Sequence, residues 1–173
     1  MMSELIDSAV MPGMQGGPLM HVIAAKAVCF LEASSPTFVL YQRQVIRNAQ
    51  AMVDAVTELG AVVVSGGTDT HQFSIDLTPY GITGKDAQAW LEKAHITLNK
   101  NSIPNDPLPP TKTSGVRVGT AAITTRGFLE ADCRLIGRCM VDIFESRGSD
   151  AVIAAVKDQM RQLTQAYPME NLL

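Results

Sequence analysis

The sequence TSGVRVGT occupies residues 113–120, and the polar stretch NKNSIPND of residues 99–106 lies shortly before it. Two β-branched valines, Val116 and Val118, stand between Gly115 and Gly119. They predict a short strand over Gly115–Gly119. Residues 99–113 contain four prolines and predict a long loop, and loops of that length are often functional. This loop and this strand are the most informative stretch of the chain.

An arginine stands in the middle of the predicted strand. Arg117 is flanked by Val116 and Val118, and an arginine buried between valines needs an anionic partner, because an unpaired buried charge is very costly. A guanidinium binds a carboxylate through two parallel hydrogen bonds. The sequence therefore predicts a carboxylate-binding position at Arg117. Two alternatives stay open from the residues alone: an internal salt bridge, and an edge-strand arginine that faces water.

Hydrophobic periodicity on both sides of this strand predicts alternating helices and strands. We expect helices over residues 18–31, 36–59, 83–91, 135–144 and 152–163, and further strands over residues 61–64, 72–77 and 96–98. Pro36 is expected to open a helix after Ser34 and Ser35, because proline is favoured at the first helical position. The helix over residues 18–31 is apolar on all sides, which predicts burial on more than one side, with a subunit interface as one place for it. Residues 1–16 are expected to form an extended, irregular arm.

These elements predict an α/β fold with a small, mainly antiparallel sheet covered by helices. The chain has 173 residues, 46% of them hydrophobic, and can bury a real core. Its net charge of −3 argues against a nucleic-acid partner, which would favour a basic patch. No secretion signal and no apolar run of membrane-spanning length is visible, so we expect a cytoplasmic protein without a membrane partner.

The three cysteines form an odd set without metal-like spacing. Cys139 falls on an apolar helix stripe, so a reduced, buried and inert thiol is expected there. The histidines are not spaced as metal ligands either. The sequence therefore predicts no metal site.

A glycine pair precedes the first long helix. Gly16 and Gly17 stand in the sequence QGGP at residues 15–18, and backbone amides freed of side chains at a helix start make a natural phosphate cradle. A simple tight turn is the alternative reading of the same residues.

Four motifs together carry a resemblance to a known family. They are MPGMQGGPLMH at residues 11–21, VVSGGTDTH at residues 63–71, the loop and arginine strand quoted above, and AITTRGF at residues 122–128. In this order they resemble the C-terminal part of serine hydroxymethyltransferase, a pyridoxal-phosphate enzyme of the aspartate-aminotransferase fold type. The resemblance implies that residues 1–35 form an arm and interface helix from the end of a large domain. Residues 36–173 would form the C-terminal α/β small domain.

The resemblance also implies roles for individual residues. Gly16 and Gly17 would contact the phosphate of pyridoxal 5'-phosphate in the partner subunit, which implies a dimer. Arg117 would hold the carboxylate of the substrate glycine or serine. Tetrahydrofolate, the co-substrate, would be contacted by residues of the long loop: Asn101, Pro109, Pro110 and Thr111. Thr111, Lys112 and Ala121 depart from residues common in the family, which puts the shape of the folate site in question.

The family's cofactor-bearing (Schiff-base) lysine lies in a Thr-Thr-His-Lys run upstream of the glycine loop. The 173 residues contain no such run. We therefore expect an enzyme by family, interconverting serine and glycine with one-carbon transfer to tetrahydrofolate, but an isolated chain that is inactive and has no catalytic residue of its own. Its expected partner is a second copy, or an N-terminal polypeptide of the same enzyme. The alternative is a non-catalytic interaction or dimerisation module derived from that enzyme.

Overall fold

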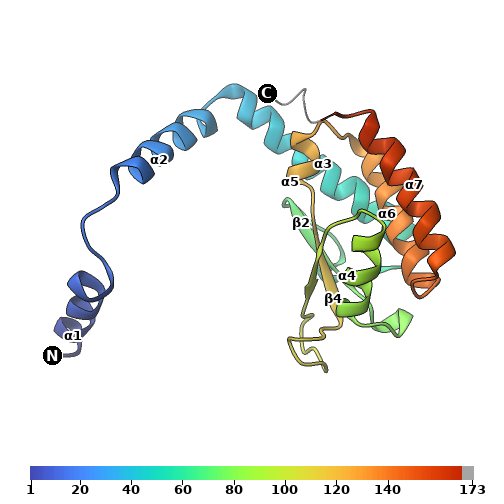
Figure 1. Cartoon of the computed structure of the whole chain (residues 1–173), viewed down its shortest axis with the longest axis horizontal. Coiled ribbons are helices and arrows are strands. Elements are labelled where there is room, and N and C mark those ends of the chain that lie inside the picture. The colour runs from blue at the N-terminus through green and yellow to red at the C-terminus, as the bar shows by residue number, and fades with distance from the viewer. Residues whose placement is uncertain (169–173) are drawn as a thin grey trace. The chain divides into compact units, whose positions relative to one another are not determined.

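A computed structural model describes residues 1–168 of the chain (Figure 1). The chain divides into two compact units, one comprising Met1–Leu40 and the other beginning at Tyr41. Each unit is described by itself.

The first unit is helical and exposed. It contains α1 (Met2–Ser8), a π-helical segment (Ala9–Met14), and α2 (Met20–Ala33). The expected extended arm over residues 1–16 is therefore wrong, although the backbone at Met11 does leave the helical region. No residue of α2 is buried within the chain. Its all-round apolarity is thus not matched by burial within the described residues of this chain. Burial of α2 in a subunit interface stays a prediction.

The second unit contains a four-stranded antiparallel sheet. Its strands are β1 (Val62–Val63), β2 (Gln72–Asp76), β3 (Asn99–Asn101) and β4 (Gly115–Gly119), in the spatial order β1-β2-β4-β3. All three strand pairs are antiparallel, so the predicted small antiparallel sheet is confirmed. The strand predicted at residues 96–98 is wrong. Ile96 and Leu98 are buried in the core. The polar residues Asn99–Asn101, which follow them, form the strand that pairs with β4.

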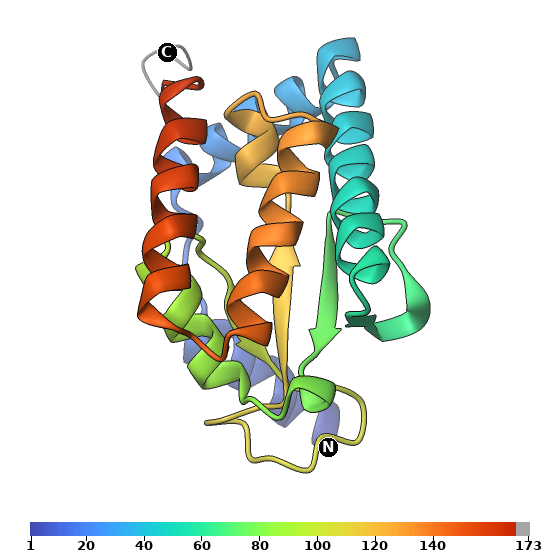
Figure 2. The ribbon, with the colours of Figure 1, turned by 90° about the vertical axis from the view of Figure 1, so that its right-hand side faces the viewer.

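Helices cover one face of this sheet (Figure 2). They are α3 (Pro36–Glu58), α4 (Gly84–Lys93), the short α5 (Ala121–Thr125), α6 (Glu130–Glu145) and α7 (Asp150–Gln165). Pro36 opens α3 as predicted. Thr83 caps α4, since its side-chain oxygen accepts a hydrogen bond from the amide of Asp86 at 3.1 Å. Helix α5 was not predicted, because its five residues are too few to show a helical period.

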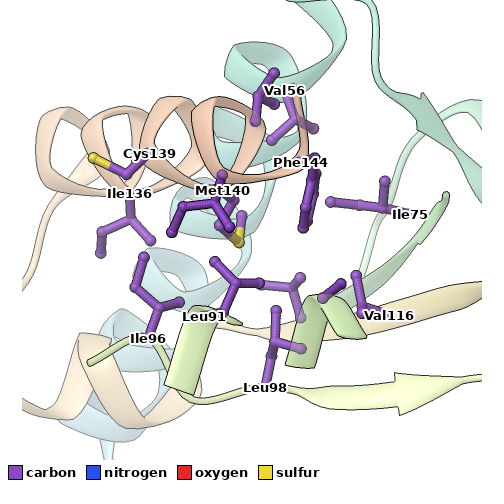
Figure 3. Close-up of a cluster of buried hydrophobic side chains, with 14 of the residues drawn as sticks. Val56, Ile75, Leu91, Ile96, Leu98, Val116, Ile136, Cys139, Met140 and Phe144 are labelled. Atoms are coloured by element: carbon purple, nitrogen blue, oxygen red, sulfur yellow. The ribbon is translucent and has the colours of Figure 1, made fainter. Parts of the chain in front are cut away.

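The core lies between the sheet and these helices. Figure 3 shows Ile75 of β2 and Val116 of β4 directed toward Leu91, Met140 and Phe144 of the helical layer. All five side chains are fully buried. At the turn between α6 and α7, Gly148 has φ +73° and packs so closely on Trp90 that an added Cβ would lie 2.3 Å from the indole. Only glycine meets both conditions there.

No single helix among residues 1–168 is long and apolar enough to cross a membrane. Helices α2 and α3 satisfy the criteria of length and composition only when they are taken together across the break between them.

A buried polar junction ties α3 to the segment that follows β4. The side-chain amide nitrogen of Asn48, a residue with no exposed surface, donates to the hydroxyl of Thr124 at 2.8 Å and to the carbonyl of Phe128 at 2.9 Å. The hydroxyl of Thr120 donates to the carbonyl of Val45 at 2.8 Å. Beyond α5, Arg126 donates to the carbonyls of Thr164 and Tyr167, which fastens the end of α7 to the same segment.

We predict that Asn48→Ala lowers the free energy of unfolding by about 2–3 kcal/mol, because a buried carbonyl and hydroxyl lose their donor. Urea denaturation followed by circular dichroism measures the change. Gln50→Ala on the exposed side of the same helix is the matched control, with an expected change below about 0.5 kcal/mol. Equal effects of the two substitutions would contradict the prediction.

Candidate anion-binding site

One face of the sheet is polar. Directly paired residues of neighbouring strands point to the same side, and the register pairs Arg117 with Ser74 on one flank and with Asn99 on the other. Because side chains alternate along a strand, this face carries Gln72, Ser74, Asp76, Asn99, Asn101 and Arg117. Val116 and Val118 are buried on the opposite face, against the helices.

Arg117 is exposed on this polar face. The premise that its valine neighbours would bury it is therefore wrong, because strand alternation sends the arginine and the valines to opposite sides. Its strand β4 lies between β2 and β3, so the edge-strand alternative is wrong too. None of the ion pairs among residues 1–168 involves Arg117, so the structure shows no internal salt bridge for it. The guanidinium can accept an external anion.

A cavity of about 290 Å³ opens at Arg117. Its walls come from β2 and from the turn that precedes it, and they comprise Val64, Ser65, Gly67, Thr68, Asp69, Thr70, Gln72, Phe73 and Ser74. Ser65, Gly67, Asp69 and Thr70 were not assigned to a site from the sequence. The GGTD turn, placed just before a strand that pairs with the arginine strand, was the signal that could have found them.

This turn is held by the hydroxyls of its two threonines. Thr68 donates to the carbonyl of Gln72 at 2.7 Å and accepts from the amide of Thr70 at 3.1 Å. The hydroxyl of Thr70 donates to the same carbonyl at 3.2 Å. Ser65 and Gly66 both have positive φ, of 65° and 72°, which lets the chain reverse tightly. The cavity wall facing Arg117 is therefore fixed by local hydrogen bonds.

The long loop is organised by Asp106. The carboxylate of Asp106 accepts hydrogen bonds from the hydroxyl of Ser114 at 2.6 Å and from its amide at 2.9 Å. It also accepts from the amides of Leu108 at 2.9 Å and Ile103 at 3.2 Å. The hydroxyl of Ser114, together with these three amides, lowers the pKa of Asp106 to about 2, because each donor stabilises the charged form. Sequence reasoning missed this role, although an aspartate in a proline-rich loop is a known turn signal.

The four residues predicted to contact folate lie at different places around this loop. Asn101 is on β3, on the same face as Arg117, and its side-chain amide donates to the carbonyl of Ser102 at 2.7 Å. Pro109, Pro110 and Thr111 are exposed on the loop and do not line the Arg117 cavity. The structure thus places Asn101 beside the strand of Arg117 and leaves the other three residues apart from the cavity.

Gly16 and Gly17 lie in the first unit, at a cavity of about 400 Å³ that precedes α2. An added Cβ at either glycine would meet nothing within 4 Å, so the space next to the backbone is open to a bound group. Lys26 lines the same cavity and supplies a positive charge. Such a cavity suits a phosphate.

The two buried cysteines are poor nucleophiles. Burial, with a smaller contribution from nearby carboxylates, raises the pKa of Cys133 to about 12 and that of Cys139 to about 11. Cys139 is a free and buried cysteine, as expected. A thiol must lose its proton to react, so the raised pKa is in keeping with an inert side chain. No cluster of three or more metal-ligating side chains occurs in the described part of the chain.

The sequence of the chain matches a known protein family. The sequence profile of the family described as serine hydroxymethyltransferase matches residues 1–140. The chain therefore belongs to the serine hydroxymethyltransferase family.

Individual members of that family are similar over almost the whole chain. The serine hydroxymethyltransferase of Acinetobacter radioresistens is 53% identical over 95% of this chain, and that of Acinetobacter baumannii is 54% identical over the same share. The Marinobacter nauticus enzyme of the same name is 53% identical over 97% of the chain. The matched regions cover only 39–40% of these proteins. The chain thus spans about two fifths of the length of the curated relatives it matches.

We predict that Asp106→Asn loosens the loop, because an uncharged amide accepts hydrogen bonds less strongly than a carboxylate. Hydrogen exchange at the amides of Leu108 and Ser114 should become faster by roughly tenfold, while amides within α6 keep their rates. Asp158→Asn, on the exposed side of α7, is the control.

The same contacts predict a pH dependence. The pKa of Asp106 in the folded chain is about 2, below its ordinary value of 3.8. Its stabilising effect is therefore complete above about pH 4 and is lost as the pH falls toward 2. Amide chemical shifts of Ile103 and Ser114 in the folded chain should titrate with a midpoint near pH 2, and a midpoint near pH 4 would contradict the assignment.

Proposed function

We propose that this chain supplies the carboxylate-binding part of a serine hydroxymethyltransferase, an enzyme that interconverts serine and glycine with transfer of a one-carbon unit to tetrahydrofolate. The supporting observation is Arg117, which lies on an inner strand, opens into a cavity and has no internal carboxylate partner among the described residues. Membership of the family supports the reaction class.

In this proposal Arg117 fixes the amino-acid substrate by its carboxylate. A guanidinium offers two parallel N–H donors to a carboxylate and so sets orientation as well as affinity. Fixing the orientation of the reacting bond can account for several kcal/mol of a barrier. Thr68 and Thr70 hold the opposite wall of the cavity in place, so the arginine works against a rigid surface.

The chain's residues also fit the cofactor that the family uses. When bound, pyridoxal 5'-phosphate supplies the electron sink for bond cleavage at the substrate Cα. Gly16 and Gly17 would hold its phosphate through their backbone amides, in trans, and the open space at both glycines and the charge of Lys26 support this role. We propose that Asn101, with Pro109, Pro110 and Thr111, contacts tetrahydrofolate. Thr111, Lys112 and Ala121 would alter the fine shape of that contact.

The proposed architecture is that of the aspartate-aminotransferase fold type. Residues 36–173 would be its small domain, which the antiparallel sheet and helical layer support. Residues 1–35 would be an arm and interface helix from the large domain. We propose a cytoplasmic protein that forms a homo-oligomer or pairs with an N-terminal polypeptide carrying the lysine.

A second candidate function is a non-catalytic interaction or dimerisation module. It is favoured by the exposed apolar side chains of α2, which include Val22, Ile23, Val28, Phe30 and Leu31. A contiguous apolar surface of this kind normally finds a partner. A tight self-association that is indifferent to glycine, serine and cofactor would favour this function over the enzyme.

We predict that the chain binds glycine and acetate weakly through Arg117. Titration followed by amide shifts of Ser74 and Val118 should give saturable binding that Arg117→Ala abolishes. Arg117→Lys should weaken it by about three- to tenfold, because the charge stays but the planar fork is lost. Arg138→Ala removes an exposed arginine of α6 and is the matched control. Binding that survives in Arg117→Ala would refute the proposed role.

We predict no serine cleavage by the isolated chain. With pyridoxal 5'-phosphate and tetrahydrofolate added, formation of glycine from serine should not exceed that of Arg117→Ala, because the 173 residues contain no Thr-Thr-His-Lys run. Turnover clearly above this variant would show that the chain carries a complete catalytic site.

A further inference from the structure

The Arg117 cavity contains a second charged group. Of the ten described residues that line it, only Arg117 and Asp69 carry a charge. We propose that Asp69 is a specificity-determining residue, which selects small ligands with a single carboxylate and disfavours ligands with a second one. This inference rests on the proposed function of Arg117 as the carboxylate-binding group.

The structure of the turn does not require the carboxylate of Asp69. The turn is closed by the hydroxyls of Thr68 and Thr70, which both donate to the carbonyl of Gln72. No hydrogen bond or ion pair of the Asp69 side chain occurs among the described residues, whereas the carboxylate of Asp76 accepts from the amide and hydroxyl of Thr78. Asp69 lines the cavity together with Arg117, and its carboxylate makes none of the hydrogen bonds that close the turn. This carboxylate is therefore free to interact with a bound ligand.

The two charges of the cavity do not neutralise each other. No nitrogen of Arg117 lies within 4.0 Å of a carboxylate oxygen of Asp69. The cavity therefore presents a cation and an anion at separate points of its wall. A ligand that places one carboxylate on Arg117 exposes the rest of its body to the negative charge of Asp69.

This arrangement discriminates by charge. An ammonium or hydroxyl group on the ligand is attracted by Asp69 or can donate to it, as in a zwitterionic α-amino acid. A second carboxylate is repelled, which is selection by an unfavourable interaction against the wrong ligand. Both charged side chains are exposed, so solvent screens the effect to a few-fold preference. Added salt should weaken it further.

The test compares acetate with malonate on the whole chain, with binding measured by titration of amide shifts. The variants are Asp69→Asn and the control Asp158→Asn, which makes the same change of charge on α7. At low salt, Asp69→Asn should increase the preference for malonate over acetate by about threefold relative to the unaltered chain. Asp158→Asn should leave this preference unchanged, and the effect of Asp69→Asn should shrink in 0.5 M sodium chloride.

The outcomes separate the two proposals. If acetate binding is the same in the unaltered chain and in Arg117→Ala, the role of Arg117 fails, and the inference on Asp69 fails with it. If acetate binding requires Arg117 but Asp69→Asn and Asp158→Asn give the same preference, only the inference on Asp69 is overturned. Asp69→Ser serves as a second variant in case the asparagine disturbs the turn, and unchanged circular dichroism confirms folding of each.

Discussion

The site depends on the alternation of side chains along β4. Val116 and Val118 enter the core against the helices, and Arg117 between them points to the opposite face. The burial of the two valines therefore fixes the direction of the arginine. A shift of the strand by one residue would expose both valines and drive the guanidinium into the core. The hydrophobic packing that stabilises the fold thus also sets the register of the site.

Two loops border the polar face, and each is stabilised by its own residues. In the long loop, the carboxylate of Asp106 accepts four hydrogen bonds. In the turn before β2, the hydroxyls of Thr68 and Thr70 both donate to the carbonyl of Gln72. Neither loop relies on a ligand for these bonds. A site with walls formed in advance loses little conformational entropy on binding, which suits small ligands that offer few contacts.

Much of the fold could be predicted from the sequence, because caps and periodic apolar residues are local signals. The helix opened by Pro36, the helix expected over residues 83–91 and the Gly115–Gly119 strand are found where they were expected. Residues 99–101 were missed as a strand because they are polar and show no alternating apolar pattern. Their pairing with β4 is a long-range contact that the local sequence does not indicate. The burial assigned to Arg117 was wrong for a related reason: neighbours in sequence do not share a face in a strand. The cavity residues Asp69 and Ser65 come from a turn, and only the folded sheet brings them beside the arginine.

The close fit between Gly148 and Trp90 has a practical consequence. The chain has a single tryptophan, and its indole lies on α4 beneath the turn joining α6 and α7. Its fluorescence therefore reports on the packing of the helical layer, on the far side of the sheet from the guanidinium. Occupancy of the polar face should be nearly silent in that emission. A ligand that changed it would reveal a strain transmitted through the strands themselves.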